Sequence, residues 1–162
     1  MAKRPDPVAP ADDEGRALAH RLLRANHAAL AYLDAESHAP GISRIAFGLS
    51  ATGHPMTLIS ALAPHFEGLQ ACADCAVMLA DEATKGDPLT HPRLMIRAQA
   101  RFIAPDDPDR AQMRDHWLAS HPKSALYIDF ADFAFVVLSP VSGLLNGGFA
   151  RAYRLSAQDL MM

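Results

Sequence analysis

The apolar residues of the chain recur mostly at the spacing of short strands. Residues 94–103 alternate apolar and polar side chains, which is the period of a strand with one buried face and one wet face. Apolar runs bounded by turn residues predict further strands at residues 28–33, 42–50, 56–60, 75–80, 133–138 and, on either side of a glycine pair, within 144–155. The connections between the first strands are short, so hairpins in a meander are the expected topology.

Helical spacing occurs at only a few places. An aspartate cap at position 12 or 13 and a left-handed terminator at Asn26 bound one amphipathic helix. Pro64, Pro108 and Pro122 each stand where the first turn of another short helix would begin. Short helices beside strands in hairpins predict an α+β fold. We expect an antiparallel sheet of six or seven strands that closes into a barrel.

The composition is that of one globular domain. The chain has 162 residues, of which 50% are hydrophobic and 20% charged, so it holds enough apolar material for a core. Residues 1–11 alternate proline, alanine and charge without a hydrophobic period, which predicts a disordered N-terminal arm. Residues 12–162 are expected to fold as a single domain.

The charge balance and the lack of long apolar runs exclude several classes of protein. Lys and Arg number 15 against 18 Asp and Glu, a net charge of -3, so the chain has no basic field for nucleic acid. It has no run of about 18 apolar residues, and its first positions are rich in charge, unlike a signal peptide. We therefore expect a cytoplasmic protein without membrane or nucleic-acid partners.

Two cysteines, Cys72 and Cys75, have the spacing of a redox pair or of half a zinc site. No second cysteine pair completes a zinc site, and the strand–helix–strand context of a thioredoxin-like motif is missing. We expect two ordinary small residues at a helix-to-strand turn, a reducing compartment, and no metal site.

Cationic side chains stand near predicted strand ends, where a phosphate could bind. His65 opens a helix directly after the strand at 56–60, so its side chain and free backbone N–H groups point to the same place. Arg44 and Arg93 each stand at a strand entrance and could complete a phosphate clamp. Each of these residues could instead be a solvated edge or cap residue. Likewise, Gly147–Gly148 could be a bulge or a close approach to a flat ligand.

Several short motifs, taken in order, carry a family resemblance. They occupy residues 55–69, 87–89, 92–100, 121–127, 130–133 and 147–151. Together they resemble the FMN-binding split-barrel family related to pyridoxamine 5'-phosphate oxidase, and within it the branch that includes haem-utilisation proteins. The resemblance covers residues 14–155. It implies a six-stranded antiparallel split β-barrel with flanking short helices, usually a homodimer with two FMN sites at the subunit interface.

The same resemblance implies a set of cofactor-binding residues. Ser43, Arg44 and Ile45 match the family's first FMN-binding strand, and Leu58, Ile59 and Ser60 match its second. Pro64 and His65 stand at the family's Arg-Lys phosphate pair, and Arg93 matches a polar FMN contact. No catalytic residue follows from the sequence.

The positions that hold substrate in the oxidase differ in this chain. The oxidase's strand-end lysine falls at Gly48, and its substrate-phosphate arginine and serine fall at His121 and Ala125. The resemblance therefore implies an FMN-binding flavoprotein, an oxidoreductase acting on an unknown small molecule, but not a true pyridoxamine phosphate oxidase. The alternative is a haem-binding or haem-utilisation protein without flavin chemistry. A third interpretation is a homologue that keeps only the fold.

Overall fold

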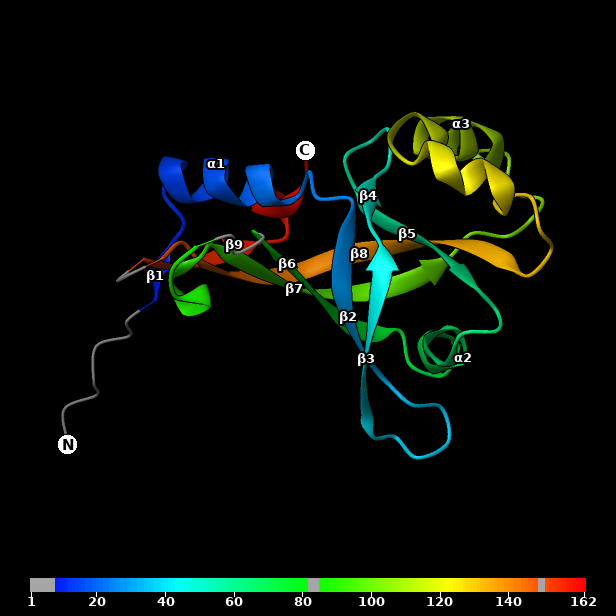
Figure 1. The fold of residues 1–162 in the computed structure, drawn as a ribbon, viewed down its shortest axis with the longest axis horizontal. Coiled ribbons are helices and arrows are strands. Elements are labelled where there is room, and N and C mark those ends of the chain that lie inside the picture. The colour runs from blue at the N-terminus through cyan, green and yellow to red at the C-terminus, as the bar shows by residue number, and fades with distance from the viewer. Residues whose placement is uncertain (1–7, 82–84, 149–150) are drawn as a thin grey trace.

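The computed structural model describes residues 8–81, 85–148 and 151–162 (Figure 1). Its strands are β1 (Ala9–Pro10), β2 (His27–Leu33), β3 (Pro40–Ala46), β4 (Gly48–Leu49), β5 (Pro55–Ser60), β6 (Asp74–Ala80), β7 (Arg93–Phe102), β8 (Phe133–Asn146) and β9 (Ala152–Ser156). Its α-helices are α1 (Asp13–Leu22), α2 (Pro64–Ala71) and α3 (Arg110–Ser120). Three 3-10 turns are η1 (Pro88–Thr90), η2 (Pro122–Leu126) and η3 (Gln158–Leu160).

One sheet carries the fold. Its hydrogen-bonded order is β1-β9-β8-β7-β6-β2-β3, while β5 pairs with the first part of β8 and β4 pairs with β5. All pairings are antiparallel except the short one between β1 and β9. The longest strands, β2, β3, β5, β6, β7 and β8, form the six-stranded split barrel, and β1, β4 and β9 are shorter additions. The predicted α+β split-barrel fold is confirmed.

The barrel is open between β3 and β5. No backbone ladder joins these two strands within the described residues. The fully buried Thr57 bridges them instead, because its hydroxyl donates a hydrogen bond to the Ala46 carbonyl at 2.6 Å. We call this gap between β3 and β5 the seam. It leaves β3 as an edge of the sheet.

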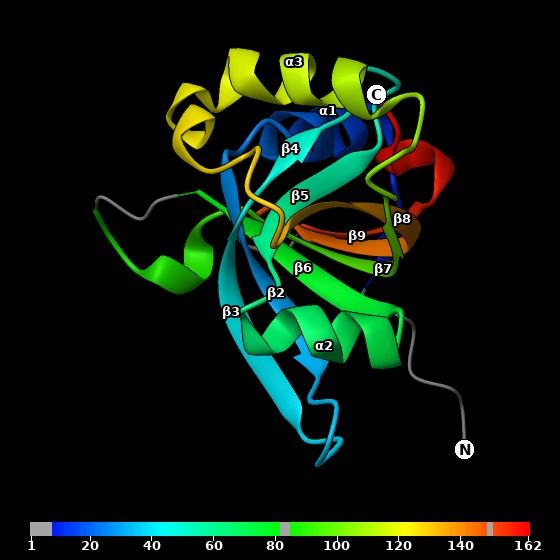
Figure 2. The same cartoon turned by 90° about the vertical axis from the view of Figure 1, so that its right-hand side faces the viewer.

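Two hydrophobic cores lie on either side of β5 and β8. The larger core lies between the sheet, α1 and α2 and includes Leu30 and Ile96. The smaller core lies under α3 and is built around Trp117. Figure 2 shows α1 and α3 on one side of the strands and α2 on the other. β5 is buried on both faces, because Leu58 belongs to the smaller core and Ile59 to the larger.

Capping residues and prolines mark the starts of the helices. The Asp12 carboxylate accepts a hydrogen bond from the backbone N–H of Gly15 at 2.7 Å, which caps α1 as predicted. α2 begins at Pro64, also as predicted. α3 begins two residues after Pro108, and Pro122 starts the 3-10 turn η2 in place of an α-helix. In the described part of the chain, no helix is long and apolar enough to cross a membrane.

β8 continues to Asn146, past the predicted strand end at Leu138. Pro140 lies within this longer strand, although proline normally interrupts a central strand. The register of β7 against β8 skips Val141, directly after Pro140, so the proline sits at a β-bulge where a backbone donor is dispensable. The strand therefore bends at this point without ending.

The predicted disordered arm needs a correction. Residues 1–7 of the arm lie outside the described residues. Ala9 and Pro10 form β1 and pair in parallel with Tyr153 and Arg154 of β9, and the Ala11 N–H donates to the Arg154 carbonyl at 3.0 Å. The prediction is wrong for residues 9–11, because composition does not reveal that the edge of β9 provides backbone partners.

Candidate functional site

We call the side of β2, β3, β6 and β7 that faces away from the larger core the outer face. Strand register aligns its residues in two rows, Arg44-Ala29-Met78-Met95 and Ile42-Ala31-Ala76-Arg97. Ile42 is 78% exposed and Met78 is 46% exposed, so large apolar side chains meet solvent at this face. The alanines between them make its middle shallow.

Alternation along the strands produces the outer face. Leu30, Val77 and Ile96 point into the larger core and are almost fully buried. Their chain neighbours, including Ala29 and Ala31, must point the other way. Because alanine has no side chain beyond Cβ, the centre of the outer face is a flat, apolar floor.

Two open cavities lie on the outer face. The first has a volume of about 340 Å³ and is lined by residues that include His27, Ala29, Arg44, Met78 and Ala80. The second has a volume of about 540 Å³ and is lined by residues that include Ala31, Ala76, Arg97 and Val141. Ala29 and Ala31 lie on the same side of β2, so the two cavities are neighbours on one surface.

Arg44 and Arg93, from the predicted set, both reach the outer face. Arg44 lines the smaller of the two cavities, and none of the described residues pairs with its guanidinium. Arg93 is the register partner of Ala80, and residues directly opposite in a sheet share a face. Its Nη1 donates to the Leu89 carbonyl at 2.9 Å. Arg44 therefore lines the cavity and Arg93 lies opposite one of its lining residues, an arrangement that suits a flat ligand with acidic groups.

Ser43 and His65 lie together, on the opposite side of β3 from Arg44. His65 Nδ1 is 3.1 Å from the Ser43 hydroxyl oxygen, and the His65 ring packs edge-on against Tyr32 with ring centres 5.9 Å apart. His65 is only 9% exposed, and burial lowers its pKa, so the imidazole is neutral near pH 7. The structure thus separates His65 from the predicted grouping with Arg44 and Arg93. That His65 holds a phosphate stays a prediction.

The remaining predicted cofactor residues lie in the interior. Ile45 and Ile59 belong to the larger core and Leu58 to the smaller, each at most 5% exposed. The Ser60 hydroxyl donates to the Asp132 carboxylate at 2.6 Å. None of these four side chains lies on the outer face, so their predicted role in cofactor binding rests on the family match alone.

The two cysteines lie at a helix-to-strand turn, as predicted. Cys72 ends α2 and Cys75 lies in β6, where its thiol approaches the Ala98 carbonyl at 3.5 Å. Burial raises the pKa of Cys75 to about 12, so this thiol is a poor nucleophile and a poor metal ligand. Among the described residues, no three His, Cys, Asp or Glu side chains stand close enough to hold a metal ion.

The glycine pair Gly147–Gly148 forms the turn between β8 and β9. Gly148 has φ of +111°, a conformation that other residues rarely adopt. A Cβ at Gly147 would lie 3.2 Å from Leu18 Cδ2 of α1. The tight turn and its packing against α1 account for both glycines without a ligand.

Sequence reasoning missed His27, the first residue of β2. Its Nδ1 lies 2.8 Å from the Asn26 side-chain oxygen, and no described residue bonds its Nε2. His27 lines the same cavity as Arg44 and Met78. Its two-residue spacing from Ala29 indicates only that both side chains lie on the same side of β2. That Met78 lies on this side too follows from the pairing of β2 with β6.

The chain is similar to a curated protein of known activity. The non-canonical heme oxygenase HOZ of Arabidopsis thaliana, a chloroplastic protein, is 32% identical over 114 residues, which are 70% of this chain. The chain spans about a third (34%) of the length of that relative. No protein-family model matches the chain.

Several solved structures share the fold of this chain. One solved structure is 42% identical to this chain in sequence and has a TM-score of 0.85, over 94% of this chain and 99% of its own length. A general stress protein 26 relative from Clostridium acetobutylicum, of the pyridoxinephosphate oxidase family, has a TM-score of 0.68 at 13% identity, over 93% of this chain and 99% of its own. The chain therefore has the split-barrel fold of proteins related to pyridoxamine 5'-phosphate oxidase. A heme binding protein from Mycobacterium smegmatis shares this fold at 22% identity with a TM-score of 0.76, over 98% of this chain and 61% of its own.

Proposed function

We propose that the protein binds haem on the outer face and acts in haem utilisation. The observation that carries this proposal is the flat alanine floor of the outer face, with His27 and two arginines around it. The names of the relatives point the same way, since one is a heme oxygenase and another a heme binding protein. These relatives support haem more than flavin.

The residues present fit a haem group. A porphyrin is flat and apolar with two acidic propionates, and Ala29 and Ala31 leave room for such a plane. His27 Nε2 is free to bind iron, and a neutral imidazole is the ligand that haem iron commonly takes. Arg44 and Arg93 suit the propionates, because a guanidinium pairs well with a carboxylate. Bound haem would supply the iron for oxygen or electron chemistry.

A second copy of the chain completes the proposed site. The outer face exposes Ile42 and Met78, Leu144 of β8 is exposed beside it opposite Met95, and a lone subunit would leave one side of the haem in water. Exposed apolar patches of this kind mark interaction surfaces. A homodimer through the outer face would cover the ligand and would bury these side chains.

FMN is the second candidate ligand, and the pair Arg44 and Arg93 favours it. Both match family positions that contact FMN; Arg44 lines the cavity, and Arg93 lies opposite Ala80, which also lines it. Two guanidinium groups suit a phosphate as well as they suit propionates. In this case the protein is an oxidoreductase in which flavin carries the redox chemistry.

Titration of the purified protein with hemin and, separately, with FMN tests the proposal. We expect a saturable Soret band with hemin, and His27→Ala should weaken hemin binding by about tenfold or more. The matched control is His116→Ala, an exposed histidine on α3 that should bind hemin as the wild type does. Tight FMN binding without a Soret band, or equal hemin binding by both variants, would overturn the haem proposal.

A further inference from the structure

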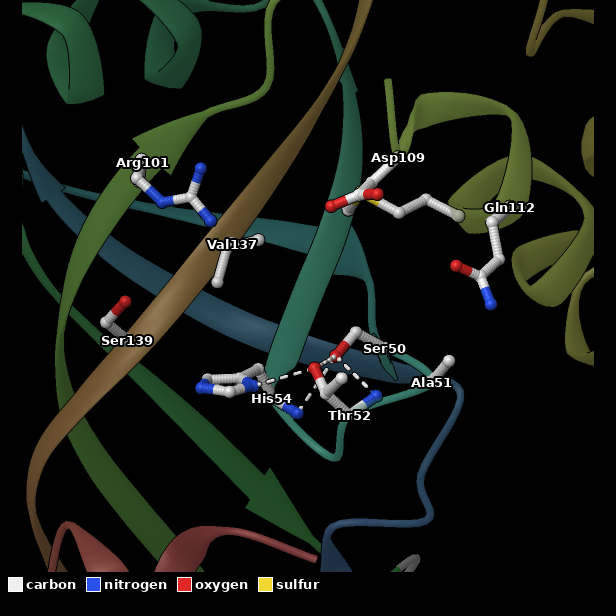
Figure 3. Close-up of a pocket in the computed structure, with 10 residues that line it drawn as sticks. Ser50, Ala51, Thr52, His54, Arg101, Asp109, Gln112, Val137 and Ser139 are labelled. Atoms are coloured by element: carbon white, nitrogen blue, oxygen red, sulfur yellow. Dashed lines mark hydrogen bonds between the residues drawn. The ribbon is translucent and has the colours of Figure 1, made fainter. Parts of the chain in front are cut away.

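A third cavity, of about 240 Å³, lies near the C-terminal end of β7 and is lined by residues other than those of the two outer-face cavities. Figure 3 shows its walls: β7 and β8 on one side, the start of α3 on another, and the turn between β4 and β5 below. Val137 and Met113 give it an apolar floor. The other lining side chains are mostly polar: Ser50, Thr52, His54, Arg101, Asp109, Gln112 and Ser139.

Two opposite charges face this cavity without neutralising each other. Arg101 comes from β7 and Asp109 directly precedes α3, so they stand on different walls (Figure 3). Within the described residues, neither side chain takes part in an ion pair or a side-chain hydrogen bond. An unpaired arginine and an unpaired aspartate beside one small cavity are available to a ligand that carries both signs.

The neutral groups of the cavity divide into a rigid set and a free set. Ser50, Thr52 and His54 hold one another, with the Ser50 and Thr52 hydroxyls 3.0 Å apart and Thr52 Oγ1 3.1 Å from His54 Nδ1. The turn that carries them is therefore ordered before any ligand arrives. Gln112 and Ser139 have no side-chain partner among the described residues and can bond a ligand's polar substituent.

We propose that this cavity binds a small zwitterion, an α-amino acid with a short polar side chain. Arg101 pairs with its carboxylate and Asp109 with its ammonium, while Gln112 and Ser139 bond the side-chain hydroxyl or amide. A simple anion would be repelled by Asp109, and a simple amine by Arg101. The volume of about 240 Å³ is below the range of about 300–1,000 Å³ for drug-sized ligands, which restricts the ligand to a small molecule. The inference does not depend on haem binding.

The probes are L-serine and two compounds that each lack one of its charges. Ethanolamine lacks the carboxylate, and 3-hydroxypropionate lacks the ammonium. In a proton–nitrogen NMR titration we expect serine to bind with a dissociation constant of about 1 mM, typical for so few atoms. The shifts should gather at residues 50–54 and at the Gln112 side-chain amide, and the two partial analogues should bind more weakly.

Variants of the charged residues carry the decisive comparison. Because Arg101 and Asp109 are exposed, we expect R101Q and D109N each to weaken serine binding by about fivefold. The matched controls are R97Q, an exposed arginine on the same strand, and D106N, an exposed aspartate in the same loop; both should bind as the wild type does. The proposal is overturned if serine causes no saturable shifts, if 3-hydroxypropionate or ethanolamine binds equally well, or if the controls weaken binding as much as R101Q and D109N.

Discussion

The hydrogen bond across the seam predicts a measurable loss of stability for Thr57→Val. Thr57 is fully buried, and its hydroxyl donates to the Ala46 carbonyl at 2.6 Å. Ala46 lies opposite His27 in β2, next to the hydrogen bond from the Phe47 N–H to the Asn26 carbonyl. Hydrogen-bonded and non-hydrogen-bonded pairs alternate in an antiparallel ladder, so the Ala46 carbonyl points away from β2 and toward Thr57.

The size of the effect follows from what valine keeps and what it loses. Valine has nearly the shape of threonine, so no cavity opens, but the Ala46 carbonyl loses its buried donor. A buried acceptor left without a partner costs about 1–3 kcal/mol, and we expect a loss of about 2 kcal/mol in the free energy of unfolding. For a chain of this length, that corresponds to a fall in Tm of about 4–8 °C.

Urea denaturation of Thr57→Val and of Thr90→Val compares the loss of a buried hydrogen bond with the loss of an exposed one. The Thr90 hydroxyl also donates to a backbone carbonyl, that of Asp87 at 2.7 Å, but it is exposed, so water can replace it. Thr90→Val should change the free energy of unfolding by less than about 0.5 kcal/mol. If Thr57→Val costs no more than Thr90→Val, the hydrogen bond does not hold the seam and the reasoning is wrong.

Three further predictions concern a buried imidazole, a half-buried thiol and a close helix contact. Because burial lowers the pKa of His65, its imidazole binds a proton at a higher pH in the unfolded chain than in the folded chain. The free energy of unfolding should therefore decrease as the pH is lowered from about 7 to about 5. The urea midpoint of His65→Asn should fall less over that interval, and an equal fall would refute the assignment. Because burial raises the pKa of Cys75 to about 12, about one thiol in ten thousand is ionised at pH 8. Mass spectrometry after iodoacetamide treatment should find Cys75 modified far more slowly in the folded protein than in urea; equally rapid modification of the folded protein would contradict the raised pKa. A Cβ at Gly68 would lie 2.5 Å from the Leu33 carbonyl oxygen, so Gly68→Ala should lower the free energy of unfolding by about 1–3 kcal/mol in urea, and an unchanged midpoint would mean that α2 shifts freely on β2.

The sequence predicted the fold correctly wherever a local pattern of residues was enough to determine the structure. The alternation at residues 94–103 gives β7 almost in full, because a strand with one buried face repeats every two residues. The end of β8 was predicted too early, at Leu138, because the bulge at Pro140 depends on how β7 pairs with β8, and that partner is some forty residues earlier in the chain. β1 was missed for the same reason, because its backbone partners lie in β9.

Only part of the candidate site could be predicted from the sequence, because the site depends on which side of a strand each residue faces. Arg44 and Arg93 were expected together, and both reach the outer face. His65 was expected with them, but it bonds Ser43, and successive residues of a strand point to opposite sides. His27 and Met78 come together only through the pairing of β2 with β6, which no local spacing encodes.

Burial of β5 on both faces has a consequence for amide hydrogen exchange. The backbone bonds between β5 and β8 lie between the two cores, where Met56 and Phe135 are fully buried, so these amides meet solvent only when the whole domain opens. β3, across the seam, has no ladder to β5 in the described residues and pairs only with β2. The amides of the edge strand that carries Arg44 should therefore exchange before those of β5, the most protected part of the barrel.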